Sequence, residues 1–178
     1  VYNKQGKATV KEGLKASQLA ERDADKTDAI AKVNWIRLSD WAERPLKDRE
    51  WAVDGWIPKG QVTLLYADGG VGKSQIILQL LTSVSLGENW FGLNTSNGSA
   101  LYLGAEDDRD ELHRRFHDVI NARFKSYNDF PNIIFSSLAG EDALLANFDP
   151  KSRRLSPSAI MKELTAAIVE HKPTICVI

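Results

Sequence analysis

One short stretch, Val62–Ser74, constrains the fold of this 178-residue chain more than any other part of the sequence. Its apolar first part, Val62–Tyr66, predicts a buried strand; the glycines that follow predict a tight turn, and an amphipathic run begins directly after Ser74. A strand, a turn ending in Gly-Lys-Ser and a helix together are typical of a P-loop, whose backbone N–H groups surround phosphate groups. Ala67 stands where the first glycine of that motif belongs, and alanine is the mildest replacement. The alternative is a glycine-rich turn in which Gly-Lys-Ser occurs by chance.

Each residue type in this turn has a physical reason to be there. Gly69, Gly70 and Gly72 allow positive φ and let the backbone approach phosphates without a Cβ in the way. The N-terminus of the following helix attracts anions. Lys73 can reach the β- and γ-phosphates of ATP, and the Ser74 hydroxyl can hold Mg²⁺. The predicted cofactor-binding residues are Asp68, Gly69, Gly70, Val71, Gly72, Lys73 and Ser74, with Ser74 also the predicted metal ligand.

Composition and charge exclude several classes of protein. With 43% hydrophobic residues, the chain is long enough for one globular core. A formal net charge of −1 shows no basic excess, which is the usual footprint of strong nucleic-acid binding. No apolar run approaches the roughly 18 residues that a membrane span needs, and the single cysteine, Cys176, excludes a disulfide within the chain. These totals fit a cytoplasmic protein that does not bind a membrane.

The sequence divides into a polar leading part and a longer patterned part. Residues 1–33 are rich in Lys, Ala, Asp and Glu and are expected to be a tail or linker, with a helix at 10–22 after a capping pair at Thr9 and Glu12. Residues 34–178 are expected to form the N-terminal part of an ATPase domain. Four tryptophans near its start predict either an aromatic lid packed on the domain's edge or a contact with the nucleotide base or a neighbouring subunit: Trp35, Trp41, Trp51 and Trp56.

Apolar runs alternate with helical patterns through the rest of the chain. This alternation predicts an α/β fold with a mostly parallel sheet and right-handed crossovers. The clearest helix starts with a capping box, in which Asp108 is followed by Glu111 three residues later. Its predicted apolar stripe is Leu112, Phe116, Val119, Ile120 and Phe124. Strands are expected at 62–66, 100–104, 133–135 and 174–178, a long loop at 137–155, and two further helices, one from Ser74 to Gly87 and one with Ser156 as N-cap and Pro157 as its first residue.

Hydrolysis of a bound nucleotide also needs a group that orients or deprotonates water, often a carboxylate at the end of a neighbouring strand. An acidic cluster follows the strand expected at 100–104, and parallel strands deliver such residues to the edge that carries the P-loop. We predict two catalytic residues: Glu106 as the general base, and Lys73 as the cation that contacts the β- and γ-phosphates. Asp107 is the second candidate for the base. Asp108 is better explained as an acid favoured by the helix dipole.

Other chemical signals in the sequence are weak. His113 and His117 have the i, i+4 spacing of metal ligands on a helix, but the ordinary interpretation is a solvated helix flank. Arg153 and Arg154 could meet phosphate or an acidic partner, although a charged pair in a loop is usually just solvated. Cys176 lies in an apolar run and is expected to be a small core residue.

Taken jointly, three segments carry a family resemblance that covers roughly residues 39–178. They are Trp51-Ala-Val-Asp-Gly-Trp-Ile-Pro-Lys-Gly, then Val62–Ser74, then Ala100-Leu-Tyr-Leu-Gly-Ala-Glu-Asp-Asp with Leu112-His-Arg-Arg-Phe. Together they resemble the RecA-like ATPases of the RepA hexameric replicative-helicase type, which are AAA family ATPases. The resemblance implies a RecA-like P-loop core with its sheet sandwiched by helices, and ATP hydrolysis between the subunits of a hexameric ring. It also implies a role on DNA in plasmid or phage replication, and it places the catalytic glutamate on Glu106.

The same resemblance sets expectations about the end of the chain. The Walker B aspartate would follow Ile178, so we expect a sheet truncated after the Walker B strand, and a segment that is aggregated or molten and hydrolyses ATP negligibly when expressed alone. Two function classes stay open. One is a DNA helicase or replication ATPase, and the other is a nucleotide-switched assembly or regulatory module with little or no hydrolysis. A small-molecule kinase is a distant third.

Overall fold

The computed structural model describes residues 34–178, and the chain divides into two units, Val1–Lys47 and Asp48–Ile178. Each unit is considered by itself. In the first unit, the described residues hold one short 3-10 helix, η1 (Leu38–Trp41), on which Trp41 is exposed. The tail expected at 1–33 and the helix expected at 10–22 lie outside the described residues. A domain that begins at residue 34 therefore stays a prediction.

Three parallel strands form the central sheet of the second unit, in the order β4-β3-β7. They are β3 (Ala100–Gly104), β4 (Ile133–Ser137) and β7 (Ile175–Val177). Ala100 of the central strand lies opposite Ile133 on one side and Ile175 on the other. Four of the five β3 residues are buried, as a strand covered on both faces requires. The α/β class and the strands expected at 100–104, 133–135 and 174–178 are confirmed.

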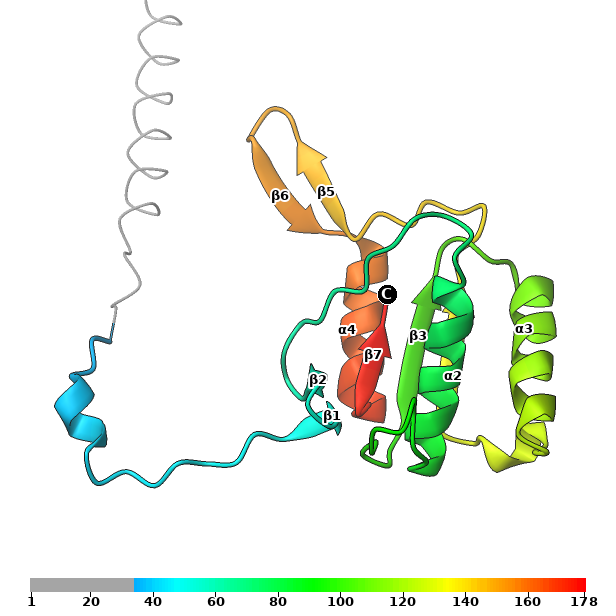
Figure 1. Ribbon diagram of the computed structural model, residues 1–178. Helices are drawn as coiled ribbons and strands as arrows, with labels where there is room; N and C mark the ends of the chain where they lie inside the picture. The colour runs from blue at the N-terminus through cyan, green and yellow to red at the C-terminus, as the bar shows by residue number, and fades with distance from the viewer. Residues whose placement is uncertain (1–33) are drawn as a thin grey trace, which may run out of the picture. The chain divides into compact units, whose positions relative to one another are not determined.

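Helices cover the two faces of this sheet. Figure 1 shows α2 (Lys73–Leu86) in front of β3 and α4 (Ala159–His171) behind β7, with α3 (Arg109–Ala122) beside α2. The amphipathic patterns of α2 and α3 supply most of the core. The fully buried side chains of this core include Leu78, Leu81, Val84 and Leu112. The arrangement is that of a RecA-like P-loop core.

The ends of the helices follow the expected local signals. Gly87 ends α2 in the left-handed conformation, with φ of 67°, and its N–H bonds back to the last turn. Asp108 caps α3 by accepting a 2.8 Å hydrogen bond from the Glu111 N–H. The other half of the expected capping box is absent, because the Glu111 carboxylate turns instead to Arg114 and Arg115.

The strand predicted for Val62–Tyr66 is wrong. These residues have no regular secondary structure, and the exposed fraction is 99% for Val62 and 86% for Leu64. A strand exists through hydrogen bonds to a neighbouring strand, and within residues 34–178 no strand pairs with this segment. Its apolar composition therefore indicated a preference for a buried strand, but no described strand pairs with it.

Three further expectations need correction. The loop predicted for 137–155 contains an antiparallel hairpin, β5 (Ala146–Asp149) and β6 (Arg154–Pro157), which Figure 1 shows beside the start of α4. Pro157 ends β6, so the helix begins two residues later than predicted, with Ser158 as N-cap accepting from the Met161 N–H. Phe124 lies beyond the end of α3 with φ of 56° and is 98% exposed, so it leaves the predicted stripe.

A second small hairpin, which the sequence did not predict, precedes the P-loop. Strands β1 (Trp51–Val53) and β2 (Ile57–Pro58) pair antiparallel, and Val53 is fully buried in the core. The Trp56 ring meets the Trp90 ring edge to face, with centroids 6.1 Å apart. Two of the four clustered tryptophans, Trp51 and Trp56, therefore belong to this hairpin or its turn. In the part of the chain that the structure describes, no helix is both long and apolar enough to cross a membrane.

Candidate functional site

Two of the three glycines in the turn adopt the left-handed backbone conformation that favours glycine. Gly70 and Gly72 have φ of 76° and 93°, and Gly72 is the N-cap of α2. A Cβ on either residue would meet no atom within 4 Å, so the demand for glycine comes from the backbone conformation and not from crowding within the chain. Gly69 does not have positive φ, which corrects that expectation. Ala67 also lies outside the left-handed region, so alanine is tolerated at this position.

The Lys73 side chain folds back over this turn. Its ammonium group donates to the carbonyl oxygens of Ala67 at 2.9 Å and Asp68 at 2.7 Å. These bonds hold a positive charge at the start of the turn, just before the glycines. The first hydrogen bond of α2 runs from the Ile76 N–H to the Gly72 carbonyl at 3.0 Å, so the N–H groups before it have no partner in the helix. A cation and free N–H donors together suit an anionic ligand.

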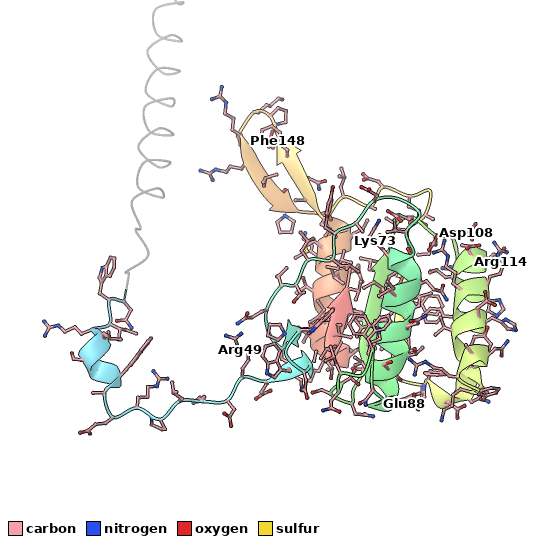
Figure 2. The ribbon with its side chains drawn as sticks, viewed as in Figure 1. Arg49, Lys73, Glu88, Asp108, Arg114 and Phe148 are labelled. Carbon is pink, nitrogen blue, oxygen red and sulfur yellow. The ribbon has the colours of Figure 1, made fainter. Side chains whose placement is uncertain are left out.

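The carboxyl end of β3 lies at the same edge of the sheet as this turn. In Figure 1 the arrows of β3 and β7 point toward the N-terminal ends of α2 and α3. Figure 2 shows Lys73 and Asp108 at these helix ends. Ligands of open α/β sheets bind at this edge, outside the carboxyl ends of the strands. The predicted phosphate-binding turn and the predicted acidic cluster therefore share one edge.

The three acids that follow β3 have three different surroundings. Glu106 is exposed, and its carboxylate forms no ion pair with another described residue. Asp107 is mostly buried, with a side chain that is 12% exposed and an oxygen 3.2 Å from Arg115 Nη2. Asp108 is occupied as the N-cap of α3. Glu106 is thus the acid of this cluster that is open to solvent and not engaged in the fold.

Two residues that the sequence did not single out hold this loop in place. The Ser137 hydroxyl, at the end of β4, donates to the Asp107 backbone carbonyl at 2.7 Å. Arg115 contacts Asp107 and also donates from Nε to Glu111 Oε1 at 2.8 Å. The i, i+4 spacing of Glu111 and Arg115 was a usable signal for their pairing. No sequence signal connects Ser137 with Asp107.

Tyr102 lies on β3, just before the acidic loop, and the negative charge of that loop affects the pKa of its phenol. Burial of the phenol is the main reason why the pKa of Tyr102 lies above its ordinary value of 10.0. The negative charges of Asp107 and Glu106 raise this pKa further, and the Arg115 guanidinium partly opposes them. The buried end of the strand and the loop are therefore electrostatically connected.

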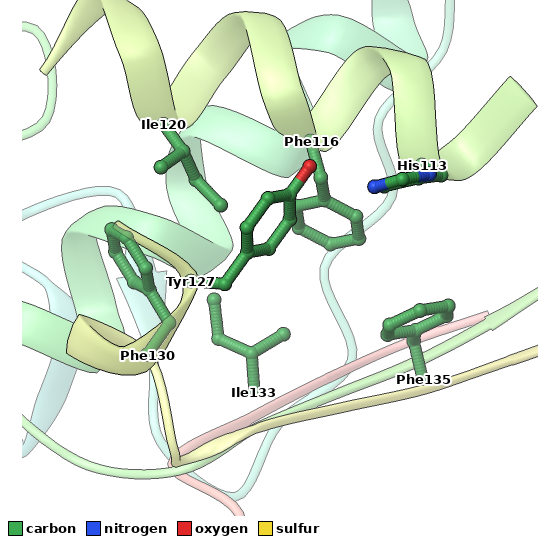
Figure 3. Close-up of a pocket in the computed structure, with 7 residues that line it drawn as sticks. All are labelled: His113, Phe116, Ile120, Tyr127, Phe130, Ile133 and Phe135. Carbon is green, nitrogen blue, oxygen red and sulfur yellow. The ribbon is translucent and has the colours of Figure 1, made fainter. Parts of the chain in front are cut away.

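The two histidines of α3 face different neighbours. The His113 ring lies 5.5 Å from the Tyr127 ring, whereas His117 contacts Asn121 and Asp118. Among residues 34–178, no group of three or more His, Cys, Asp or Glu side chains is placed to hold a metal ion. Figure 3 shows His113 at the rim of an apolar pocket of about 300 Å³ between α3 and β4, lined otherwise by Phe116, Ile120, Tyr127, Phe130, Ile133 and Phe135.

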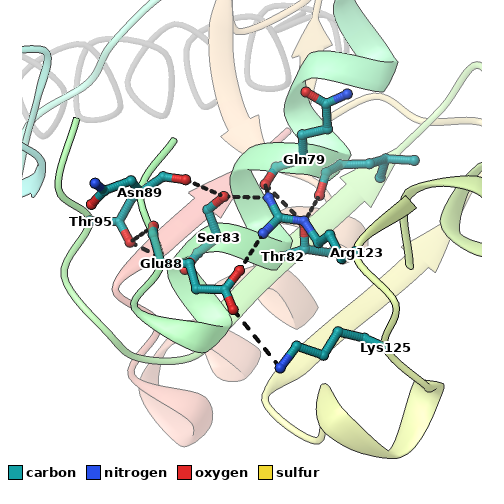
Figure 4. A network of polar contacts seen from close by, with 9 residues as sticks. Gln79, Thr82, Ser83, Glu88, Asn89, Thr95, Arg123 and Lys125 are labelled. Carbon is teal, nitrogen blue, oxygen red and sulfur yellow. Dashed lines mark hydrogen bonds and ion pairs between the residues drawn. The ribbon is translucent and has the colours of Figure 1, made fainter. Parts of the chain in front are cut away.

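A polar network at the opposite end of α2 and α3 is structural. Arg123 donates from Nη1 to Glu88 at 2.7 Å and from Nη2 to the Ser83 hydroxyl at 2.6 Å, as Figure 4 shows. The same Nη2 also lies 3.3 Å from the Gln79 carbonyl oxygen. Arg123 follows the last residue of α3 and its partners lie on or just after α2, so this cluster ties the two helices together.

The remaining candidate residues, Arg153, Arg154 and Cys176, lie on the β5–β6 hairpin and on β7 and not in the P-loop turn. Arg153, with φ of 53°, ends the turn of the β5–β6 hairpin, and Arg154 begins β6; both are exposed. Cys176 is half-buried on β7, and this burial raises the pKa of its thiol. A thiol of raised pKa is a weak nucleophile, in keeping with a packing role.

Comparison with known proteins gives one match. A protein-family model described as AAA domain matches residues 29–178. No curated protein and no solved structure matches the chain.

Proposed function

Because this chain belongs to the AAA domain family of P-loop ATPases, matched over residues 29–178, we propose that it binds Mg·ATP on the turn Asp68–Ser74 and hydrolyses it. The observation that carries the proposal is Lys73, whose ammonium is held on the carbonyls of Ala67 and Asp68, within a turn that contains two left-handed glycines at the N-terminus of α2. In binding, Lys73 exchanges its two carbonyl partners for β- and γ-phosphate oxygens, and backbone N–H groups of the turn surround the phosphates.

The donors of this turn also fit the cation that accompanies ATP. Ser74 lies in the first turn of α2, directly after Lys73, and would hold Mg²⁺ through its hydroxyl oxygen, a ligand type that this ion prefers. When bound, Mg²⁺ neutralises part of the charge on the β- and γ-phosphate oxygens.

We assign the general base to Glu106. Its carboxylate takes a proton from a water molecule while the water oxygen forms a bond to the γ-phosphorus and the bond to the bridging oxygen of ADP breaks. Glu106 is exposed and follows the carboxyl end of β3 by two residues, at the sheet edge that carries the P-loop turn, and this position supports the role. The surroundings of Asp107 argue against it as the base, because its carboxylate is mostly buried and paired with Arg115.

The finer role rests on the motif resemblance. We propose a ring-forming, hexameric DNA helicase or replication ATPase, since the resemblance to RepA-type helicases covers the P-loop and the segment with Glu106. A nucleotide-switched assembly module is the competing proposal. DNA-stimulated ATP turnover by an oligomeric species supports the helicase role, whereas nucleotide-dependent assembly without turnover supports the switch.

The test uses two substitutions in the full-length protein. Lys73→Ala should abolish most of the binding of a fluorescent ATP analogue, whereas Lys59→Ala, at an exposed lysine before the turn, should leave it unchanged. Glu106→Gln should keep the binding and lower turnover by about 10²-fold or more. Asp110→Asn, at an exposed acid in the first turn of α3, is its control. Wild-type affinity and turnover in Lys73→Ala would contradict the P-loop assignment.

A further inference from the structure

In the loop that carries Glu106, the two following residues form contacts with the rest of the fold, whereas the Glu106 side chain is exposed. Asp107 is held through its backbone by the Ser137 hydroxyl, 2.7 Å away, and through its carboxylate by Arg115, 3.2 Å away. The next residue, Asp108, is the N-cap of α3. Three ties on two consecutive residues restrict the backbone beside Glu106, although its own side chain points to solvent.

Arg115 is the central member of these ties. Its Nε donates to Glu111 Oε1 at 2.8 Å while its Nη2 reaches Asp107 Oδ1, so one guanidinium bridges α3 and the β3–α3 loop. The second oxygen of the Asp107 carboxylate, Oδ2, is buried and has no hydrogen-bond partner among the described residues. Arg115 is therefore the only cation that the described residues place on this mostly buried carboxylate, and losing it would leave the charge uncompensated.

We propose that Arg115 is a positioning residue for ATP hydrolysis, holding Asp107 so that the adjacent Glu106 stays directed at the attacking water. This inference rests on the proposed function. Its physical reason is that a general base must lie within hydrogen-bond reach of the water, and a displacement of about 1 Å can lower the rate by about 10²-fold. Ser137 assists by fixing the Asp107 carbonyl from β4.

The neighbouring arginine is a matched control. Arg114 donates from Nε to Glu111 Oε2 at 3.0 Å, but Arg115 is the arginine paired with Asp107. Removing either side chain takes one ion pair from Glu111, whereas only the loss of Arg115 frees the loop. Methionine keeps the length of the side chain and the helix propensity of both positions.

The experiment measures kcat, the KM for ATP and the thermal midpoint of the full-length protein with Arg115→Met, Arg114→Met and Ser137→Ala. Arg115→Met should lower kcat about tenfold or more while the KM for ATP stays within about threefold, because the phosphate-binding turn is untouched. Arg114→Met should keep wild-type kcat. Ser137→Ala removes two hydrogen bonds, the one to the Asp107 carbonyl and the one from the Ala139 N–H, but leaves no unpaired charge, so it should fold normally and lower kcat to a smaller extent.

A double-mutant cycle separates positioning from general weakening of the fold. In the Glu106→Gln background, Arg115→Met should cause no further loss of kcat, because the residue it positions no longer acts. The inference would be overturned if Arg115→Met lowered kcat by the same factor in the wild-type and Glu106→Gln backgrounds. It would also be overturned if Arg115→Met and Ser137→Ala both kept wild-type kcat. Either result would leave the proposed ATPase intact. Wild-type kcat in Glu106→Gln would instead overturn the assigned base, and the role of Arg115 with it.

Discussion

The Tyr102 side chain lies directly over Gly104, two residues further along the same strand. A Cβ built on Gly104 would lie 2.6 Å from the Tyr102 hydroxyl oxygen and 2.7 Å from its ring carbon Cε1. Both residues are buried, and Gly104 is the last residue of β3 before the acidic loop. The absence of a side chain at 104 therefore lets the aromatic ring pack under the loop that carries Glu106.

Gly104→Ala should destabilise the protein by about 1–3 kcal/mol, because a methyl group in that position forces the Tyr102 ring out of its packed rotamer. Chemical denaturation would measure the change. In a Tyr102→Leu background the same glycine substitution should cost clearly less, since the atoms it meets are gone. An equal cost in both backgrounds would mean that the penalty arises elsewhere.

The stability of the protein should fall with rising pH in a way that Tyr102 explains. Its pKa in the folded state lies above the ordinary value of 10.0, mainly through burial. A group of this kind stabilises the fold fully below its unfolded pKa and loses that contribution as the pH rises through the folded pKa. As the pH rises above the ordinary tyrosine pKa of about 10, wild type should therefore lose more unfolding free energy than Tyr102→Phe. Identical losses in the two proteins would refute the effect.

Arg123→Met should lower the unfolding free energy by about 2 kcal/mol, because it leaves the Ser83 hydroxyl and the Glu88 carboxylate without their 2.6 and 2.7 Å partner. Lys125→Met is the comparison, since its ammonium lies 4.0 Å from Glu88 and is more exposed, and it should change stability by less than about 0.5 kcal/mol. Urea denaturation of both variants measures the difference. Similar small effects would show that the network in Figure 4 contributes little.

Asp108→Ala should cost about 1 kcal/mol of stability, the usual loss when an N-cap acceptor is removed. Asp108→Asn keeps an oxygen that can accept from the Glu111 N–H, so it should retain most of that stability. Thermal unfolding of the two variants, followed by circular dichroism, makes the comparison. A loss as large in the asparagine variant would assign the effect to charge near the helix dipole and not to the capping bond.

Some predictions from sequence failed where distant parts of the chain decide the outcome. Val62–Tyr66 has the composition of a buried strand, yet strand formation needs a hydrogen-bonded neighbour, and no strand within residues 34–178 pairs with this segment. The β5–β6 hairpin was missed because each strand has only four residues, too few for a clear alternating pattern, and all eight residues are exposed and add nothing to the core. Phe124 continues the helical period of α3 but lies past its end, where the backbone turns left-handed.

The sequence by itself determined the features that depend on residues within about one turn of each other: the Gly-Lys-Ser turn before α2, the Gly87 end of that helix and the Asp108 cap of α3. These are set by backbone conformation and by hydrogen bonds over three or four residues. Only the tertiary structure decided which acid of the cluster is free. The Asp107 carboxylate is paired with Arg115, eight residues away, and its backbone carbonyl is bound by Ser137, 30 residues away on another strand, while Glu106 is left exposed. Contacts of that range follow from how α3 and β4 pack around β3, and no local pattern records them.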